Sequence, residues 1–418
     1  MTGPAGGAPL LSDDEVRRAH GRTRAVLVSG QVLAGIGMGS TLSAGALLVT
    51  EVSGSAAWSG MAATMTTVGA ALASVPLARL ARRSGRSPAL ATGALTAALG
   101  AVAGILAAVL VSLPLLLVAL ALIGVGTAVN LQSRFAATDL SEPRHRGRDL
   151  AIVVWATTVG AIAGPNLIAP ADAVGVALGL PELSGPFLFT LTAQALASIM
   201  YLVALRPDPL KMAERLRLER PVSAVIENVA DANGVRTGLI ALALSHATMV
   251  AVMSMTPVHL VAHGATLVVV GVTISLHIAG MYALAPLFGI LSDRLGRGPT
   301  IALGQAMLLA SLLTTALGAE SHEAVVVGLI LLGLGWSAAT VAASALVSES
   351  APAERRTIIQ GRSDLLMSAT GAVGGALAGP VLALVGYAGL ALSALLLVVV
   401  VLVALSWRAV RRGTVTRN

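Results

Sequence analysis

Long apolar runs are the feature that most constrains how this chain can fold. Twelve segments of about 20 to 26 residues carry few or no charges, which is the length a helix needs to cross a hydrocarbon core about 30 Å thick. Only 11% of the 418 residues are charged, whereas soluble domains carry about 25%. The two-residue alternation of a transmembrane β-barrel is missing. The sequence therefore predicts an all-α integral membrane protein.

The expected spans divide into two sets of six, separated by a polar linker. The first run is too long for a signal-peptide core, so we interpret it as an uncleaved span. The predicted organisation is a polar tail (1–24), a first six-helix bundle (25–205), a linker (206–236), a second bundle (237–407) and a tail (408–418). The spans themselves are 25–50, 57–78, 88–111, 114–137, 149–170 and 185–205, then 237–258, 265–291, 299–318, 323–347, 363–385 and 387–407.

Basic residues fall in alternate loops. Lys and Arg occur in the two tails, the linker and the segments 79–86, 144–148, 294–297 and 355–362, whereas the opposite loops contain none. By the positive-inside rule this predicts twelve spans with both termini in the cytoplasm. The net charge of +7 is thus explained by orientation, and no nucleic-acid partner is expected. The excess of Arg over Lys and the richness in Ala, Gly and Val are typical of a GC-rich bacterial genome, which favours a bacterial inner membrane.

The two sets carry the same landmarks in the same order, roughly 210 residues apart, which indicates duplicated halves. The matching pairs are Gly85-Arg86 with Gly296-Arg297, Pro143 with Pro352, and the Gly-xxx-Gly-Pro segments Gly160/Gly164/Pro165 with Gly375/Gly379/Pro380. Glycines spaced by four let helices approach closely, and proline lets a helix bend, although simple helix packing explains the segments equally well.

The segment Gly289-Ile-Leu-Ser-Asp293-Arg294-Leu-Gly296-Arg297 resembles the cytoplasmic loop signature of the major facilitator superfamily. The resemblance covers nearly the whole chain and implies two pseudo-symmetric six-helix bundles that transport a solute by alternating access. It also implies that Asp293, Arg294 and Arg297 latch the cytoplasmic ends together, with Glu349 as an acid partner. The first-half copy carries Arg82 where the Asp belongs. There we expect Arg83 and Arg86 to meet Asp139, and Asp364 to receive Arg82.

Span five favours a direction of transport. The segment Gly160-Ala-Ile-Ala-Gly164-Pro165 resembles the signature of proton-coupled exporters in that superfamily, although Leu120 stands where such exporters often carry an Arg in span four. The resemblance implies export of a small organic solute or drug in exchange for protons. The alternatives are a metabolite importer of the same fold, a transition-metal exporter that uses His and Met ligands, and a membrane sensor without transport.

Polar and aromatic residues within the spans are the candidates for a central cavity: Gln31, Asn130, Arg134, Trp155, Thr158, His246, Met249, His277, Tyr282 and Trp336. Arg134 could attract an anionic substrate or extend to the interface. No clear acidic residue lies mid-membrane, so His246, His277 or Glu51 is expected to carry the coupled proton, although a membrane-buried His can equally serve only as a hydrogen-bond partner.

No enzyme activity, metal site or cofactor is expected. The chain lacks a Gly-rich phosphate loop followed by Lys-Ser/Thr, and its scattered Ser, His and acidic residues do not form a nucleophile–base pattern. The partners we expect are a small-molecule substrate, protons and the lipid bilayer, with the chain acting as a monomer.

Overall fold

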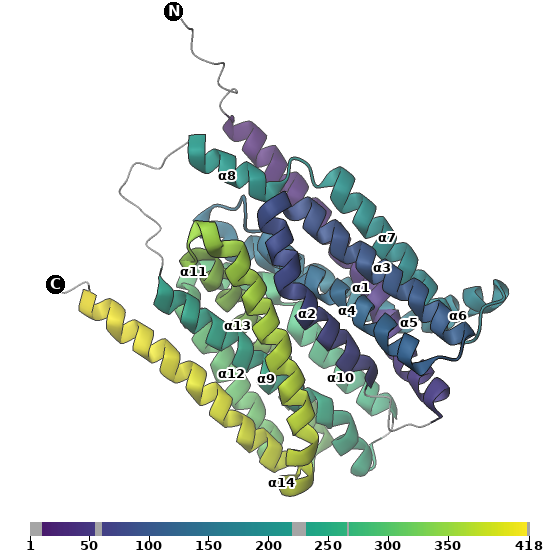
Figure 1. Ribbon diagram of the computed structural model, residues 1–418. Helices are drawn as coiled ribbons and strands as arrows, with labels where there is room; N and C mark the ends of the chain where they lie inside the picture. The colour runs from purple at the N-terminus through teal and green to yellow at the C-terminus, as the bar shows by residue number, and fades with distance from the viewer. Residues whose placement is uncertain (1–10, 55–60, 220–230, 266, 416–418) are drawn as a thin grey trace, which may run out of the picture.

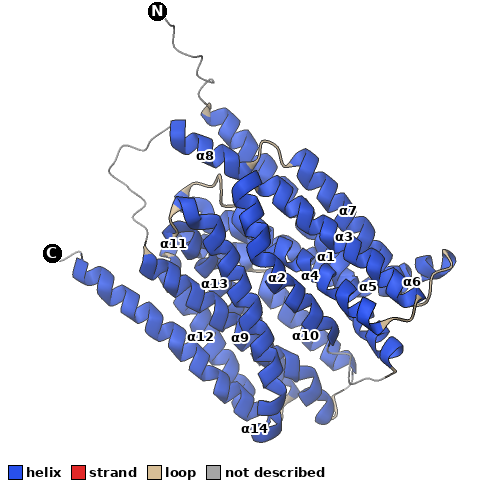
Figure 2. Cartoon of the chain, in the orientation of Figure 1, coloured by secondary structure: helices blue, strands red, loops and turns tan. Residues whose placement is uncertain are grey.

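The computed structural model describes residues 11–54, 61–219, 231–265 and 267–415, and its described secondary structure is helical with no strand (Figure 2). The helices, which Figure 1 labels, are α1 (Asp13–Ser53), α2 (Met61–Ser84), α3 (Arg86–Val109), α4 (Leu113–Ala136), α5 (Arg146–Asn166), α6 (Ile168–Ala177), α7 (Gly185–Ala204), α8 (Pro209–Glu219), α9 (Ala232–Ala262), α10 (Leu267–Tyr282), α11 (Ala285–Leu295), α12 (Arg297–Leu317), α13 (His322–Ser350) and α14 (Arg356–Val415). Two 3-10 turns, η2 (Pro143–His145) and η3 (Ala353–Arg355), precede α5 and α14.

Within the described ranges, nine helical segments are long and apolar enough to cross a membrane. The expected spans and the observed helices do not always coincide. Span 265–291 is divided between α10 and α11, because Pro286 lies in the first turn of α11, where its missing N–H costs no hydrogen bond. Spans 363–385 and 387–407 both lie in α14, which changes direction at Gly386, whose φ of 71° favours glycine.

The helices pack as a first helix group (α1–α7) and a second helix group (α9–α14), which lie on opposite sides of the molecule in Figure 1. Two apolar clusters draw on residues 26–205 and a third on residues 249–402. Across the groups, α2 packs on α14 and α5 packs on α11. A small apolar cluster joins Leu150, Ala151 and Val154 of α5 to Ala285 and Val341. These contacts define the boundary where a site shared by both groups can form.

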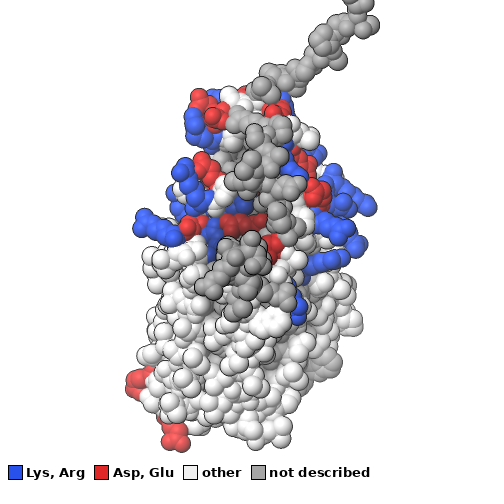
Figure 3. Space-filling model, turned by 90° about the vertical axis from the view of Figure 1, so that its left-hand side faces the viewer, with Lys and Arg blue, Asp and Glu red and all other residues white. Residues whose placement is uncertain are grey.

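Charged side chains gather at one end of the molecule, here called the charged end, which carries α8, the start of α1, η2, η3 and the end of α14. Figure 3 shows most of the charged side chains of one face towards its upper end, whereas its lower end shows Asp or Glu but no Lys or Arg. The first turn of α1 is capped by Ser12, whose N–H donates to Glu15 at 2.8 Å and lowers the pKa of that carboxyl by stabilising its charge. Helix α8 connects the two groups, because Arg217 donates to Glu354 at 2.8 Å.

Candidate transport cavity and its closing contacts

A cavity of about 210 Å³ lies between the two helix groups. It contains six of the predicted cavity residues: Gln31 and Asn130, Arg134 and His246, Tyr282 and Trp336. Its other lining residues are Thr66, Thr67, Ala70, Thr127, Leu131, Val154, Thr157, Met281, Thr340, Met367 and Ser368. Helices α1, α2, α4 and α5 contribute one wall, and α9, α10, α13 and α14 the other. A change in the angle between the groups would therefore open or close this space.

Aromatic rings form the wall contributed by the second helix group. The indole Nε1 of Trp336 donates to Nδ1 of His246 at 3.1 Å, which leaves the His246 proton on Nε2. Tyr282 meets Trp336 edge to face, with ring centroids 5.8 Å apart. Gly371 makes room for this arrangement, because a Cβ there would lie 2.6 Å from the His246 ring. The wall offers flat apolar surface with a few hydrogen-bonding groups, as small-molecule sites typically do.

Arg134 is the only charged residue among the described cavity-lining residues. It is 2% exposed, and its Nη2 donates to Oδ1 of Asp364 at 2.7 Å. Asp364 lies behind it, fully buried, and does not line the cavity. Its Oδ2 and the Arg134 Nε have no hydrogen-bond partner among the described residues. The pair therefore presents a cation to the cavity and keeps its counter-charge out of reach.

One sequence prediction about these charges was wrong. Asp364 pairs with Arg134 and not with Arg82, because Arg82 is exposed at the charged end while Asp364 points into the boundary between the groups. Arg134 is held inside by that pair and does not extend to the interface. Asp364, which the sequence placed near the start of span eleven, is thus buried among the helices. A buried charge of this kind is rare in membrane helices and is usually functional.

Four predicted cavity residues lie elsewhere. Trp155 is 41% exposed on the outer side of α5, and Thr158 is buried, whereas Val154 and Thr157 face the cavity. Met249 lies in the apolar core of the second group. His277 is fully buried against α13, where its Nδ1 lies 2.8 Å from the Leu329 carbonyl oxygen.

Glu51, the other proposed proton carrier, is exposed near the end of α1 and does not line the cavity. No group of three or more His, Asp or Glu in the described part of the chain could hold a metal ion.

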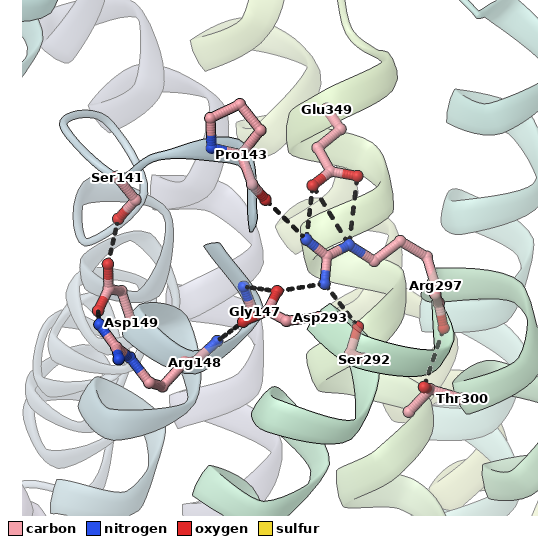
Figure 4. A network of polar contacts seen from close by, with 11 residues as sticks. Ser141, Pro143, Gly147, Arg148, Asp149, Ser292, Asp293, Arg297, Thr300 and Glu349 are labelled. Atoms are coloured by element: carbon pink, nitrogen blue, oxygen red, sulfur yellow. Dashed lines mark hydrogen bonds and ion pairs between the residues drawn. The ribbon is translucent and has the colours of Figure 1, made fainter. Parts of the chain in front are cut away.

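The loop between α11 and α12 closes the charged end against the first helix group (Figure 4). Asp293 accepts the backbone N–H groups of Gly147 and Arg148 at 2.9 and 2.8 Å, at the start of α5. This places a carboxylate at the positive end of the α5 dipole. Arg297 binds the same carboxylate, and its Nη2 donates to Glu349 at 2.6 Å and to the Pro143 carbonyl at 3.2 Å. The predicted fourth member, Arg294, is exposed.

The matching loop between α2 and α3 repeats this geometry at the other side of the charged end. Gly85 and Gly296 both precede a helix with positive φ, 103° and 97°, and each is followed by an Arg that binds an acidic residue. Arg86 is fully buried and donates to Asp139 at 2.7 and 3.1 Å, and also to Gln360 of the second group at 2.8 Å. The predicted contact of Arg83 with Asp139 is wrong, because Arg83 is exposed.

Close backbone contacts accompany both loops. A Cβ on Gly289 would lie 2.6 Å from the Gly147 carbonyl oxygen, and one on Gly361 would lie 2.9 Å from the Ser74 carbonyl oxygen. Glycine is thus required where α11 meets α5 and where α14 meets α2.

Of the predicted hinge residues, Gly160 lies against Gly35 of α1, and Gly375 lies near Val250. A Cβ on Gly379 would have no neighbour within 4 Å, and Pro380 is exposed within α14. The other two predicted hinge residues of span five, Gly164 and Pro165, lie outside the residues whose side chains the structure describes.

Several site residues were missed from the sequence. Gln360 connects Arg86 to the second group, and Asp149 accepts from Ser141 at 2.7 Å and lies 3.0 Å from the His20 ring. Thr127 also lines the cavity, and a signal for it existed, because it precedes Asn130 by three residues and Arg134 by seven on one helical face.

Known proteins resemble this chain over most of its length. The sequence matches the profile of the Major Facilitator Superfamily over residues 27–281 and again over 238–418. It is 35% identical over 390 residues to the MFS-type transporter YdeG of Bacillus subtilis (strain 168), covering 92% of this chain and 91% of that protein. It is 28% identical over 362 residues to the riboflavin transporter RfnT of Brucella anthropi, covering 86% and 89%.

Solved structures show the same fold at low sequence identity. The human organic anion transporter MFSD10 aligns with a TM-score of 0.72 and 15% identity over 92% of this chain and 99% of that one. The transporter FucP in its outward conformation aligns with a TM-score of 0.67 and 17% identity over 94% and 99%.

Proposed function

Because the chain belongs to the Major Facilitator Superfamily, we propose that it carries a small organic anion through the cavity between its two helix groups by alternating access. The observation that carries the proposal is Arg134, the one charge among the described lining residues of a cavity otherwise built from aromatic, amide, hydroxyl and apolar groups. A guanidinium there suits a carboxylate or a similar planar anion. Trp336 and Tyr282 suit a flat ring on the same solute.

The proposed topology has twelve spans, with both termini cytoplasmic, in the cytoplasmic membrane of a bacterium. It rests on the charged end, since basic residues accumulate on the cytoplasmic side of membrane proteins. The helix groups would then be the two six-helix bundles, joined through 206–236. Both walls of the cavity come from one chain, which supports a monomer as the working unit.

We propose that the ion pair Arg134–Asp364 couples the solute to protons. A substrate anion that binds Arg134 takes over its positive charge, which leaves the buried Asp364 without a counter-ion. An unpaired buried carboxylate is costly and is relieved by taking up a proton. Proton and anion then bind together, which favours their movement in the same direction. The sequence had suggested His246, His277 or Glu51; His246 alone of these lines the cavity, where it is held by Trp336.

Export in exchange for protons is the second candidate. Its support is the span-five segment Gly160 to Pro165, which is similar to that of proton-coupled exporters. The relative RfnT, named as a riboflavin transporter, supports an organic solute with a planar ring system under either candidate.

The function is tested by uptake of a panel of radiolabelled aromatic and aliphatic carboxylates into proteoliposomes. We expect a carboxylate to be transported by the wild type and by Arg134→Lys with reduced affinity, but not by Arg134→Gln. Trp155→Phe, on the outer side of α5, is the matched control and should transport normally. Transport of neutral or cationic solutes that survives Arg134→Gln would contradict the anion assignment.

A further inference from the structure

The α2–α3 loop (first copy, 78–86) and the α11–α12 loop (second copy, 289–297) differ at the position that holds Asp293 in the second copy. In the second copy Asp293 accepts two backbone N–H groups at the start of α5. In the first copy the corresponding residue is Arg82, which faces the start of α14. The two helix starts match, since α5 follows the turn η2 and α14 follows the turn η3. The first copy therefore lacks the negative charge that the second copy supplies from its own sequence.

Basic side chains surround the place where that charge is missing. Arg82, Arg355 and Arg362 line a pocket of about 350 Å³, together with Glu354, Ile358 and Ile359. The single acid, Glu354, is turned to Arg217 of α8, which donates to it at 2.8 Å. None of the three arginines forms an ion pair with any other described residue. Three cations line one hollow at a helix start, and the only acid among its described lining residues is the one already paired with Arg217.

We propose that this pocket binds a phosphate-bearing anion, which takes the place of the carboxylate that Asp293 provides in the other copy. Arginine presents a planar fork of donors that matches phosphate oxygens, and the start of a helix adds a favourable dipole. The phosphate can come from a phospholipid headgroup or from a soluble phosphate compound, since the pocket lies at the charged end.

The anion would control the closing of the charged end, which goes beyond the carriage of a solute. Arg82 belongs to the first helix group, whereas Arg355 and Arg362 belong to the second. When the groups meet, like charges oppose each other across the boundary. A bound phosphate neutralises them and connects the groups. The closed state is therefore favoured by the ligand, in the way that Arg297, Asp293 and Glu349 favour it on the other side.

The binding test uses the full chain in a neutral detergent and inorganic phosphate as the probe. We expect phosphate to raise the thermal unfolding midpoint of the wild type more than chloride at the same ionic strength. Arg82→Asp restores the carboxylate of the second copy and should weaken phosphate binding by about tenfold or more, the loss expected for one charged contact. Arg83→Asp changes the same charge on an exposed neighbour outside the pocket and should leave binding unchanged. Arg82→Gln serves if the Asp variant fails to fold.

The conformational test uses nanodiscs of phosphatidylcholine with and without phosphatidylglycerol. The sequence has no Cys, so spin labels can be placed at the exposed Arg144 and Arg294, one in each helix group, after substitution by Cys. We expect phosphatidylglycerol, phosphate or both to shift the distances between the two labels towards the shorter values of the closed state. Arg82→Asp should remove this response. A response to the lipid alone assigns the headgroup as the source, and a response to phosphate alone assigns a soluble ion.

Equal responses in wild type and Arg82→Asp, or no response to either anion, would overturn the proposal. Neither readout involves transport, so these results are independent of the substrate.

Discussion

Replacing Arg134 or Asp364 singly should lower the free energy of unfolding by unequal amounts, because the two side chains have different surroundings. Arg134 lines the cavity, although it is only 2% exposed, whereas Asp364 is fully buried and does not line the cavity. Arg134→Gln therefore leaves a buried carboxylate without a partner. Asp364→Asn leaves a cation at the cavity wall, with an amide oxygen still available to it as acceptor.

The magnitudes follow from that difference. Arg134→Gln removes one partner and leaves the other charge buried and uncompensated, which lowers the free energy of unfolding by about 3–5 kcal/mol. Asp364→Asn replaces a charged acceptor by a neutral one in the hydrogen bond with Arg134, which lowers the free energy of unfolding by about 1–2 kcal/mol. The double variant Arg134→Gln/Asp364→Asn leaves no buried charge, so it should recover about 2 kcal/mol or more relative to Arg134→Gln, which is the size expected for coupled neighbours.

The assay is the thermal unfolding midpoint of each purified variant in one detergent, recorded by tryptophan fluorescence over a range of pH. The deficit of Arg134→Gln should shrink as the pH falls, because the folded state then gains a proton that cancels the buried charge. Asp364→Asn should show no such dependence. A larger loss in Asp364→Asn than in Arg134→Gln, or a pH-independent deficit in Arg134→Gln, would refute the reasoning.

Three further variants test the closing contacts and the cavity wall. Gly289→Ala should oppose closure of the charged end by about 1–3 kcal/mol, because its Cβ would meet the Gly147 carbonyl oxygen, and it should therefore reduce uptake. The control Gly271→Ala, whose Cβ would have no neighbour within 4 Å, should leave uptake unchanged. Arg86→Gln should lower the free energy of unfolding by about 3–5 kcal/mol by leaving Asp139 unpaired, while the exposed Arg83→Gln changes it little in the same unfolding assay. His246→Ala should weaken substrate binding with a small effect on stability. His277→Ala should lower stability with a small effect on substrate binding, because the lost contact of His277 with Leu329 lies away from the cavity. Ligand titration and thermal unfolding together check both variants.

The helical membrane fold was predictable because the length and spacing of apolar runs are set by the bilayer itself. Where helices break was less predictable. The interruption between α10 and α11 depends on how Pro286 starts a new helix, and the apolar run gives no sign of it. The contacts of Arg86 with Asp139 and of Arg297 with Glu349 could be proposed because the loop copies fix their order along the chain.

The candidate cavity was predictable only in part, because the rotation of each helix is set by its neighbours. Helix α5 presents Thr157 to the cavity, whereas the sequence had favoured Trp155 and Thr158 of the same helix. The choice of Arg134 as the partner of Asp364 depends on how α4 meets α14, which no spacing along one helix reveals. The pattern within one span predicted which residues share a face, but not which way that face points.

The most direct test of coupled anion transport measures solute and proton movement together in proteoliposomes that contain a pH-sensitive dye. For the carboxylate identified by uptake, we predict that the solute and protons enter together, that an inward proton gradient accelerates uptake, and that Asp364→Asn transports the solute without protons. Proton release from the vesicles on solute entry would contradict shared binding at Arg134 and Asp364 and would support exchange; solute uptake coupled to protons in Asp364→Asn would remove Asp364 from the mechanism.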